Sequence, residues 1–309
     1  MKRSLDRFTV LRVAPLLLIL LSAACAIPPS RALPATPSAE IVTTTAPAAP
    51  PTRTPTEAPT QQPTPSATPA PSATPSASAP LVVVDAGHGG TDLGARHFDA
   101  HGVMDYCEST VTLDLAMFVR DALLARGYRV LLTRDGDYML NDFEEDTNGD
   151  GIIDTADDLQ TRLDLINAEG ADLLLSLHLN AFYFASGADS SGVGGTITYY
   201  CSDRPFGDDS LRFGLLVQEE VIAALRALGH DVDDRGVERD VALGAHLILL
   251  GPETERIARP SQMPGALSEP LFITHRREGE LARDPEALSA LAEAYAVAVE
   301  RYFAGGTEP

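Results

Sequence analysis

The chain has 309 residues, with 23 basic and 44 acidic side chains and a formal net charge of −21 at pH 7. Within residues 81–309 there are 17 arginines and 41 acidic residues, and such an acidic surface argues against nucleic acid or an anionic bilayer as a direct partner, because phosphate binding needs clustered Lys and Arg. The length of residues 81–309 suits one sizeable domain with its own core. The charge of this domain excludes nucleic acid as its partner.

Residues 1–25 have the organisation of an export signal. A basic lead precedes an apolar run over residues 13–21, which is too short to cross a membrane comfortably but is typical of a signal peptide. The small residues before Cys25 resemble a bacterial lipoprotein signal, in which the cysteine becomes the lipidated N-terminus. Ser22 stands where such signals prefer leucine, so ordinary cleavage after an alanine stays open. Both alternatives predict an exported protein of the cell envelope, and lipidation would anchor it in the membrane.

Residues 26–80 consist almost entirely of Pro, Thr, Ala and Ser, and they contain 15 of the 23 prolines. This composition cannot bury enough apolar surface to offset the entropy of ordering, so we expect a disordered, extended stalk. At ~3.1 Å per residue, such a segment reaches on the order of 100 Å.

From Leu81 onward, predicted strands alternate with predicted helices. Strands are expected at 81–84, 128–132, 173–177, 194–200, 247–250 and 266–272, and helices at 108–126, 159–168, 211–228 and 285–303. The continuous apolar runs at 81–84 and 173–177 are typical of buried parallel strands. The alternation predicts a single α/β domain with a central, mostly parallel sheet flanked by helices, in which ligands gather beyond the carboxyl ends of the strands.

Two histidines, His88 and His178, each follow a predicted strand, so we expect both at the same edge of the sheet. Glu108 begins the helix that follows the first of these strands. Two imidazoles and one carboxylate form a known ligand set for catalytic zinc, with the fourth position left for water. Spacing alone does not separate this site from structural or solvent-exposed histidines, and both interpretations stay open at this point.

Several motifs together carry a resemblance to a known family. They are Asp85-Ala86-Gly87-His88-Gly89-Gly90, Glu108, Thr133-Arg134, Arg162, Ser176-x-His178-x-Asn180 and Glu269 ahead of Phe272. In combination they resemble the zinc-dependent N-acetylmuramoyl-L-alanine amidases of the amidase-3 type, from residue 81 to about residue 304. The resemblance implies that His88, Glu108 and His178 hold zinc and that Glu269 is the catalytic carboxylate. A solvated loop carboxylate is the alternative for Glu269.

The resemblance also implies a reaction. Zinc-activated water would hydrolyse the peptidoglycan amide between N-acetylmuramic acid and L-alanine, while Glu269 takes the water proton and delivers it to the leaving nitrogen. Asn180 and Arg162 are candidate substrate contacts, although for Arg162 we favour a structural role in holding a helix to a loop. A catalytically weak wall-binding or scaffolding module is the alternative function, because the stretch before Glu269 is unusually rich in proline. The sequence identifies no protein activator.

One segment is foreign to that family. Residues 146–157 resemble an EF-hand or dockerin calcium loop, with glycine at the sixth position and an apolar residue at the eighth. The expected ligands are the side chains of Asp146, Asn148, Asp150, Asp154 and Asp157 and the carbonyl of Ile152. We expect calcium to order this insert, and a flexible acidic loop is the alternative.

The sequence does not decide the role of two further cysteines, Cys107 and Cys201. Leftover cysteines in an exported protein can form a disulfide. Cys107 also adjoins Glu108 and could replace it as a zinc ligand, but the glutamate fits the family better.

Overall fold

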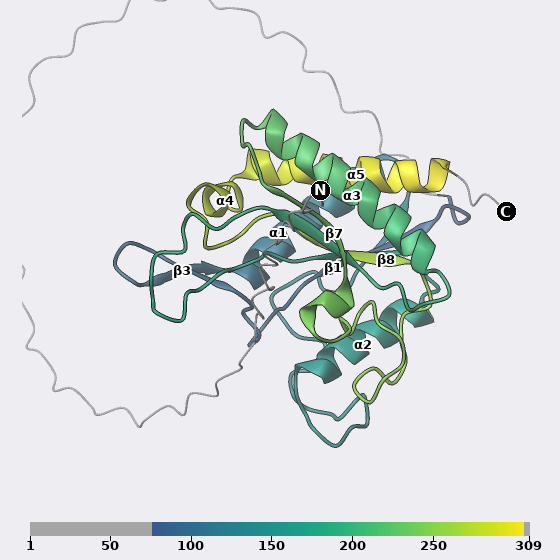
Figure 1. Ribbon diagram of the computed structural model, residues 1–309. Helices are drawn as coiled ribbons and strands as arrows, with labels where there is room; N and C mark the ends of the chain where they lie inside the picture. The colour runs from purple at the N-terminus through teal and green to yellow at the C-terminus, as the bar shows by residue number, and fades with distance from the viewer. Residues whose placement is uncertain (1–75, 306–309) are drawn as a thin grey trace, which may run out of the picture. The chain divides into compact units, whose positions relative to one another are not determined.

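The computed structural model describes residues 76–305 (Figure 1). The predicted signal peptide, residues 1–25 with Cys25, and most of the predicted stalk lie outside the described residues. Among the helices of residues 76–305, none has the length and apolar character required to span a bilayer.

A six-stranded sheet forms the centre of the domain, in the strand order β4-β1-β5-β8-β6-β7. The strands are β1 (Leu81–Ala86), β4 (Arg129–Leu132), β5 (Leu173–Leu177), β6 (Thr196–Tyr200), β7 (Asp234–Arg239) and β8 (Gly265–Glu269). β4, β1, β5 and β8 run parallel, β6 is antiparallel to β8, and β7 is parallel to β6. The carboxyl ends of β1, β5 and β8 therefore share one edge, and those of β6 and β7 lie at the opposite edge.

Helices cover both faces of the sheet (Figure 1). They are α1 (Glu108–Ala125), α3 (Gly207–Ala227) and α5 (Pro285–Ala304) on one face and α2 (Thr155–Ala168) on the other, with a short α4 (Arg276–Leu281) and a 3₁₀ helix (Asp240–Leu243). A separate hairpin pairs β2 (Arg96–Phe98) with β3 (Met104–Cys107) just before α1.

Successive residues of the central strands point into two different cores, as the period of two of a β-strand requires. Val82 and Val84 pack in the core beneath α1, α3 and α5. Val83 packs in the second core with Leu163 of α2 and with Leu250. Because both faces are covered, β1 needs apolar residues at nearly every position, which explains its unbroken apolar sequence.

The predicted fold class, a mostly parallel sheet flanked by helices, is confirmed, and so are most elements. The strand expected at 247–250 is wrong: this segment ends in a turn in which Leu249 and Leu250 are buried, so the apolar run reports burial rather than extension. β8 ends at Glu269, before Pro270, which has no N–H to donate to the ladder. β7 was not predicted, because its sequence is mostly polar and it lies at the sheet edge. The β2–β3 hairpin and α4 were not predicted either.

Candidate active site

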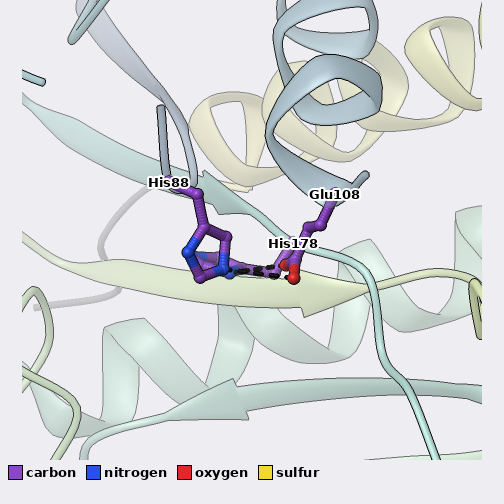
Figure 2. Close-up of side chains that lie close together, drawn as sticks. All are labelled: His88, Glu108 and His178. Carbon is purple, nitrogen blue, oxygen red and sulfur yellow. Dashed lines mark hydrogen bonds and ion pairs between the residues drawn. The ribbon is translucent and has the colours of Figure 1, made fainter. Parts of the chain in front are cut away.

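Three side chains that are far apart in the sequence converge at the edge where β1 and β5 end (Figure 2). His88 Nε2 lies 3.1 Å from Glu108 Oε2, and His178 Nδ1 lies 3.0 Å from Glu108 Oε1. One ligand atom from each residue lies within 4.8 Å of the other two. The structure thus brings together the three residues that the sequence placed at one edge.

The backbone is built for this close approach. His88 lies two residues beyond β1 and has a φ of 63°, and Glu108 is the first residue of α1. A Cβ atom on Gly94 would lie 2.5 Å from Glu108 Oε2, and one on Gly87 would lie 2.5 Å from the His178 ring. Any side chain at these two positions would therefore push the three residues apart, which explains the glycine at both of them.

Hydrogen bonds from outside the cluster fix the orientation of its members. Asp92 Oδ2 lies 2.8 Å from His88 Nδ1, which leaves His88 Nε2 facing Glu108. The N–H groups of Ala95 and Leu179 donate to the two oxygens of Glu108. A carboxylate that holds the second ring nitrogen of a histidine is the common outer partner in metal sites.

The charges in the cluster are strongly coupled. Burial alone would raise the pKa of Glu108, but His88 and His178 hold it well below its usual range. Burial would lower the pKa of His88, but Glu108 and Asp92 outweigh this effect and raise it to about 10. The same negative charge would favour a divalent cation between these groups.

The geometry of the cluster fits zinc. Nitrogen and oxygen ligands at about 2.0–2.2 Å from a tetrahedral zinc ion lie roughly 3.3 Å apart. The two nitrogen–oxygen distances here, 3.1 and 3.0 Å, are close to that separation. The donors, two imidazoles and one carboxylate, are also the set that leaves one coordination position free in catalytic sites.

Glu269 lies at the same edge, as the last residue of β8, which pairs with β5. It is therefore a strand-end residue and not a solvated loop carboxylate. Burial, followed by the nearby charge of Glu108, raises the pKa of Glu269 to about 8. The Asn180 side-chain amide donates a hydrogen bond to Glu269 Oε2, and Asn180 therefore contacts the carboxylate directly.

Arg162 has a structural environment. It is 1% exposed and donates to Asp85 at 2.9 Å, to Asp158 at 2.8 Å and to the carbonyl oxygens of Ala86 and His88. These contacts fasten α2 to the loop that carries His88. They favour the structural role over a contact with substrate.

Residues with no role assigned from the sequence also support this loop. Arg134 is buried and donates to the carbonyl oxygens of Ala86, Gly87 and Ser109. Asp92 is the outer partner of His88 described above. Arg134 stands in a recognised motif, but a motif gives no signal that separates a residue that binds the loop backbone from one that binds a ligand.

The predicted calcium loop directs its acidic side chains toward its own backbone. Asp146 accepts hydrogen bonds from the N–H groups of Gly149 and Gly151, and Asp157 accepts from those of Asn148 and Asp154. Asp154 caps α2 and pairs with Arg256 at 2.9 Å. Within residues 76–305, three groups of His, Cys, Asp or Glu bring their ligand atoms within 4.8 Å of one another, and no loop residue belongs to them. The structure therefore lends the calcium prediction no support.

The cysteines Cys107 and Cys201 are not joined in a disulfide. Both thiols are free and buried. Cys107 precedes α1 with its Sγ 3.3 Å from Ser109 Oγ, whereas Cys201 follows β6 and contacts His246. Glu108, and not Cys107, faces the two histidines.

Comparisons with known proteins point to one family. A family model described as N-acetylmuramoyl-L-alanine amidase, amidase-3, matches residues 82–301. The germination-specific N-acetylmuramoyl-L-alanine amidase of Bacillus subtilis is 30% identical over 75% of this chain and 83% of its own length. The N-acetylmuramoyl-L-alanine amidase AmiA of Escherichia coli is 26% identical over 72% of this chain and 76% of its own.

Solved structures share the fold. The CwlD amidase of Clostridioides difficile, solved in complex with the GerS lipoprotein, superposes with a TM-score of 0.56 at 23% identity, covering 74% of this chain and all of that one. The N-acetylmuramoyl-L-alanine amidase AmiC2 of Nostoc punctiforme gives 0.53 at 24% identity, covering 73% of this chain and 97% of that one.

Proposed function

Because the chain belongs to the amidase-3 family of N-acetylmuramoyl-L-alanine amidases and is therefore a peptidoglycan amidase, we propose that it cleaves the bond between N-acetylmuramic acid and L-alanine with zinc held by His88, Glu108 and His178. The observation that carries the proposal is the convergence of these three side chains within 4.8 Å of one another, beside the strand-end carboxylate of Glu269. Acting on the cell wall requires an exported protein.

Glu269 serves as the general base and then as the general acid. It takes a proton from the attacking water and delivers it to the leaving nitrogen. When bound, zinc would lower the pKa of water and polarise the scissile carbonyl. Its positive charge would also lower the pKa of Glu269, which favours the ionised form that a base requires. Asn180 holds the Glu269 carboxylate in place through its amide.

The proposed reaction is tested by digesting purified peptidoglycan with the protein and identifying the products. We expect release of stem peptides with a free L-alanine amino group and intact glycan strands, loss of this release when zinc is chelated, and its return when zinc is restored. Release that persists after complete chelation would overturn the zinc proposal. A protein that sediments with peptidoglycan but releases nothing would favour the alternative of a wall-binding module.

We further propose that Cys25 is lipidated and anchors the mature protein in the membrane, with the domain facing the cell wall. The basic lead, the apolar run and the small residues before Cys25 support this proposal. Wild-type protein should fractionate with membranes, and Cys25→Ala should release or mislocalise it. A soluble native protein whose N-terminus is another residue would contradict the lipid anchor.

We also retain calcium binding by residues 146–157 as a proposal, supported by the ligand pattern of the sequence. The side chains would have to turn from the backbone toward the ion. Aspartate at the twelfth position is short, so we expect a dissociation constant of roughly 10⁻⁵ to 10⁻³ M. Calcium at ten times that constant would add about 1.4 kcal/mol to the free energy of unfolding.

Calcium binding is measured by titration calorimetry, and its effect on stability is measured by thermal unfolding in calcium. Magnesium at the same concentration is the control for ionic strength. Asp150→Ala removes one ligand and should abolish the calcium-specific response. Absence of binding heat in the wild type, together with a melting temperature that millimolar calcium does not move, would leave the segment as a plain acidic loop.

A further inference from the structure

A second cluster of potential metal ligands lies at the edge of the sheet opposite the candidate active site. β6 and β7 run parallel and end at this edge with Tyr200 paired to Arg239. The next residues along each strand, Cys201 and Asp240, are therefore neighbours. His246 comes from the loop that follows the 3₁₀ helix and completes the group.

The three ligand atoms have the separations of a metal-binding site. Cys201 Sγ lies 3.6 Å from His246 Nδ1, and His246 Nδ1 lies 3.1 Å from Asp240 Oδ2. With zinc–sulfur bonds of about 2.3 Å and zinc–nitrogen or zinc–oxygen bonds of about 2.0–2.2 Å, tetrahedral coordination places sulfur and nitrogen ~3.5 Å apart and nitrogen and oxygen ~3.3 Å apart. Both observed distances are close to these values.

The surroundings of His246 also resemble those of a metal ligand. Its Nδ1 points toward Cys201 and Asp240, while its Nε2 faces Asp203 Oδ2 at 3.7 Å. A carboxylate at the far nitrogen is the usual outer partner of a metal-bound imidazole. Cys201 and Asp240 are 1% and 0% exposed, whereas His246 is partly exposed and leaves a route for an ion from solvent.

We propose that Cys201, Asp240 and His246 form a second metal site, specific for a thiolate-binding divalent cation of the zinc class, with water in the fourth position. A thiolate and a carboxylate together neutralise a doubly charged ion, and the sulfur and imidazole donors select zinc over calcium or magnesium. Burial raises the pKa of the Cys201 thiol to about 11, so the thiol carries its proton at neutral pH. An entering ion would bind the thiolate and release that proton.

The site would have a structural role, since it joins the end of β6 to the loop between the 3₁₀ helix and β8. That loop leads into the strand that ends at Glu269. Arg204, three residues after Cys201, already donates to the Gly251 carbonyl oxygen and to the Ser261 hydroxyl of the same loop. A bound ion would add a further connection to this loop and fix the course of the chain toward β8.

Without an ion, the same residues make an ordinary polar cluster. His246 would lie between Asp240 and Asp203, and Cys201 would be a thiol beside it. The two arrangements differ in the state of the Cys201 sulfur, which is a thiolate bound to metal in one and a thiol in the other. The experiment therefore follows sulfur–metal bonding rather than activity.

The test measures bound metal in the full chain. For wild type loaded with zinc, we expect about two equivalents per chain, and for Cys201→Ser and His178→Ala about one each, because each removes a ligand of a different site. After loading with cobalt(II), the charge-transfer absorption of a cobalt–thiolate bond should be present in wild type and in His178→Ala. It should be absent in Cys201→Ser and present in Cys107→Ser, which changes the other buried cysteine.

The wild-type protein alone can overturn the proposal, by binding a single equivalent of zinc and showing no cobalt–thiolate band. A band that survives Cys201→Ser, or that disappears in Cys107→Ser, would assign the sulfur ligand elsewhere and would also overturn it. His246→Gln provides a second variant should Cys201→Ser fail to fold as judged by circular dichroism. It should likewise lose about one equivalent of zinc while the site at His88 stays filled.

Discussion

Replacing Glu269 by glutamine should leave zinc binding intact and lower amidase activity by about 100-fold or more, the usual scale for a general acid–base residue. Glutamine keeps the size of the side chain and can still contact Asn180, but it cannot take a proton from water. Glu269 is not one of the three ligands and lies at the end of a different strand, β8, so the substitution should leave the ligands in place. Zinc per chain and the rate of stem-peptide release should be measured on the same preparation.

Glu253→Gln is the matched control, because Glu253 is exposed in the loop that precedes β8. We expect this variant to keep wild-type activity and wild-type zinc content. Turnover of Glu269→Gln at the wild-type rate would remove Glu269 from the mechanism. Loss of zinc in that variant would instead show that the carboxylate supports the metal site, and the fall in activity would then say nothing about proton transfer.

Strand order explains how much of the candidate site could be predicted from the sequence. His88 and His178 each follow a predicted apolar strand, and the carboxyl ends of parallel strands meet at one edge. Glu269 lies within the strand expected at 266–272, so its role came from the family resemblance. Glu108 could be placed because the helix that it begins has clear apolar spacing. The positions of the two histidines and of Glu108 depend only on local pattern and on the general geometry of parallel sheets.

The second cluster could not be predicted in this way. Cys201 and Asp240 become neighbours through the register of β6 and β7, and β7 is a polar edge strand with no apolar pattern to reveal it. His246 lies in the loop just before residues 247–250, which the sequence presents as a strand. The sequence also left a disulfide between Cys107 and Cys201 open, because no local pattern shows that the two cysteines lie in different surroundings.

The role of Arg162 likewise depends on a distant partner. Asp85 is fully buried at the end of β1, with Arg162 at 2.9 Å and hydrogen bonds from Thr133 and Ser176. Burial alone would raise the pKa of Asp85, but Arg162 and the two hydroxyl donors lower it, so the carboxylate is charged. A charge in this position needs its counter-charge far more than a surface group does.

Replacing Arg162 by methionine should therefore lower the free energy of unfolding by about 3–5 kcal/mol, because Asp85 is left buried without its cation. Arg256→Met is the control: Arg256 forms an exposed pair with Asp154 at 2.9 Å, and its loss should cost less than about 1 kcal/mol. Urea unfolding of both variants at neutral pH measures the difference. An Arg162→Met protein as stable as wild type, with a raised KM for peptidoglycan and unchanged kcat, would restore Arg162 as a substrate contact. The expected loss of stability would instead assign it to holding α2 against the His88 loop.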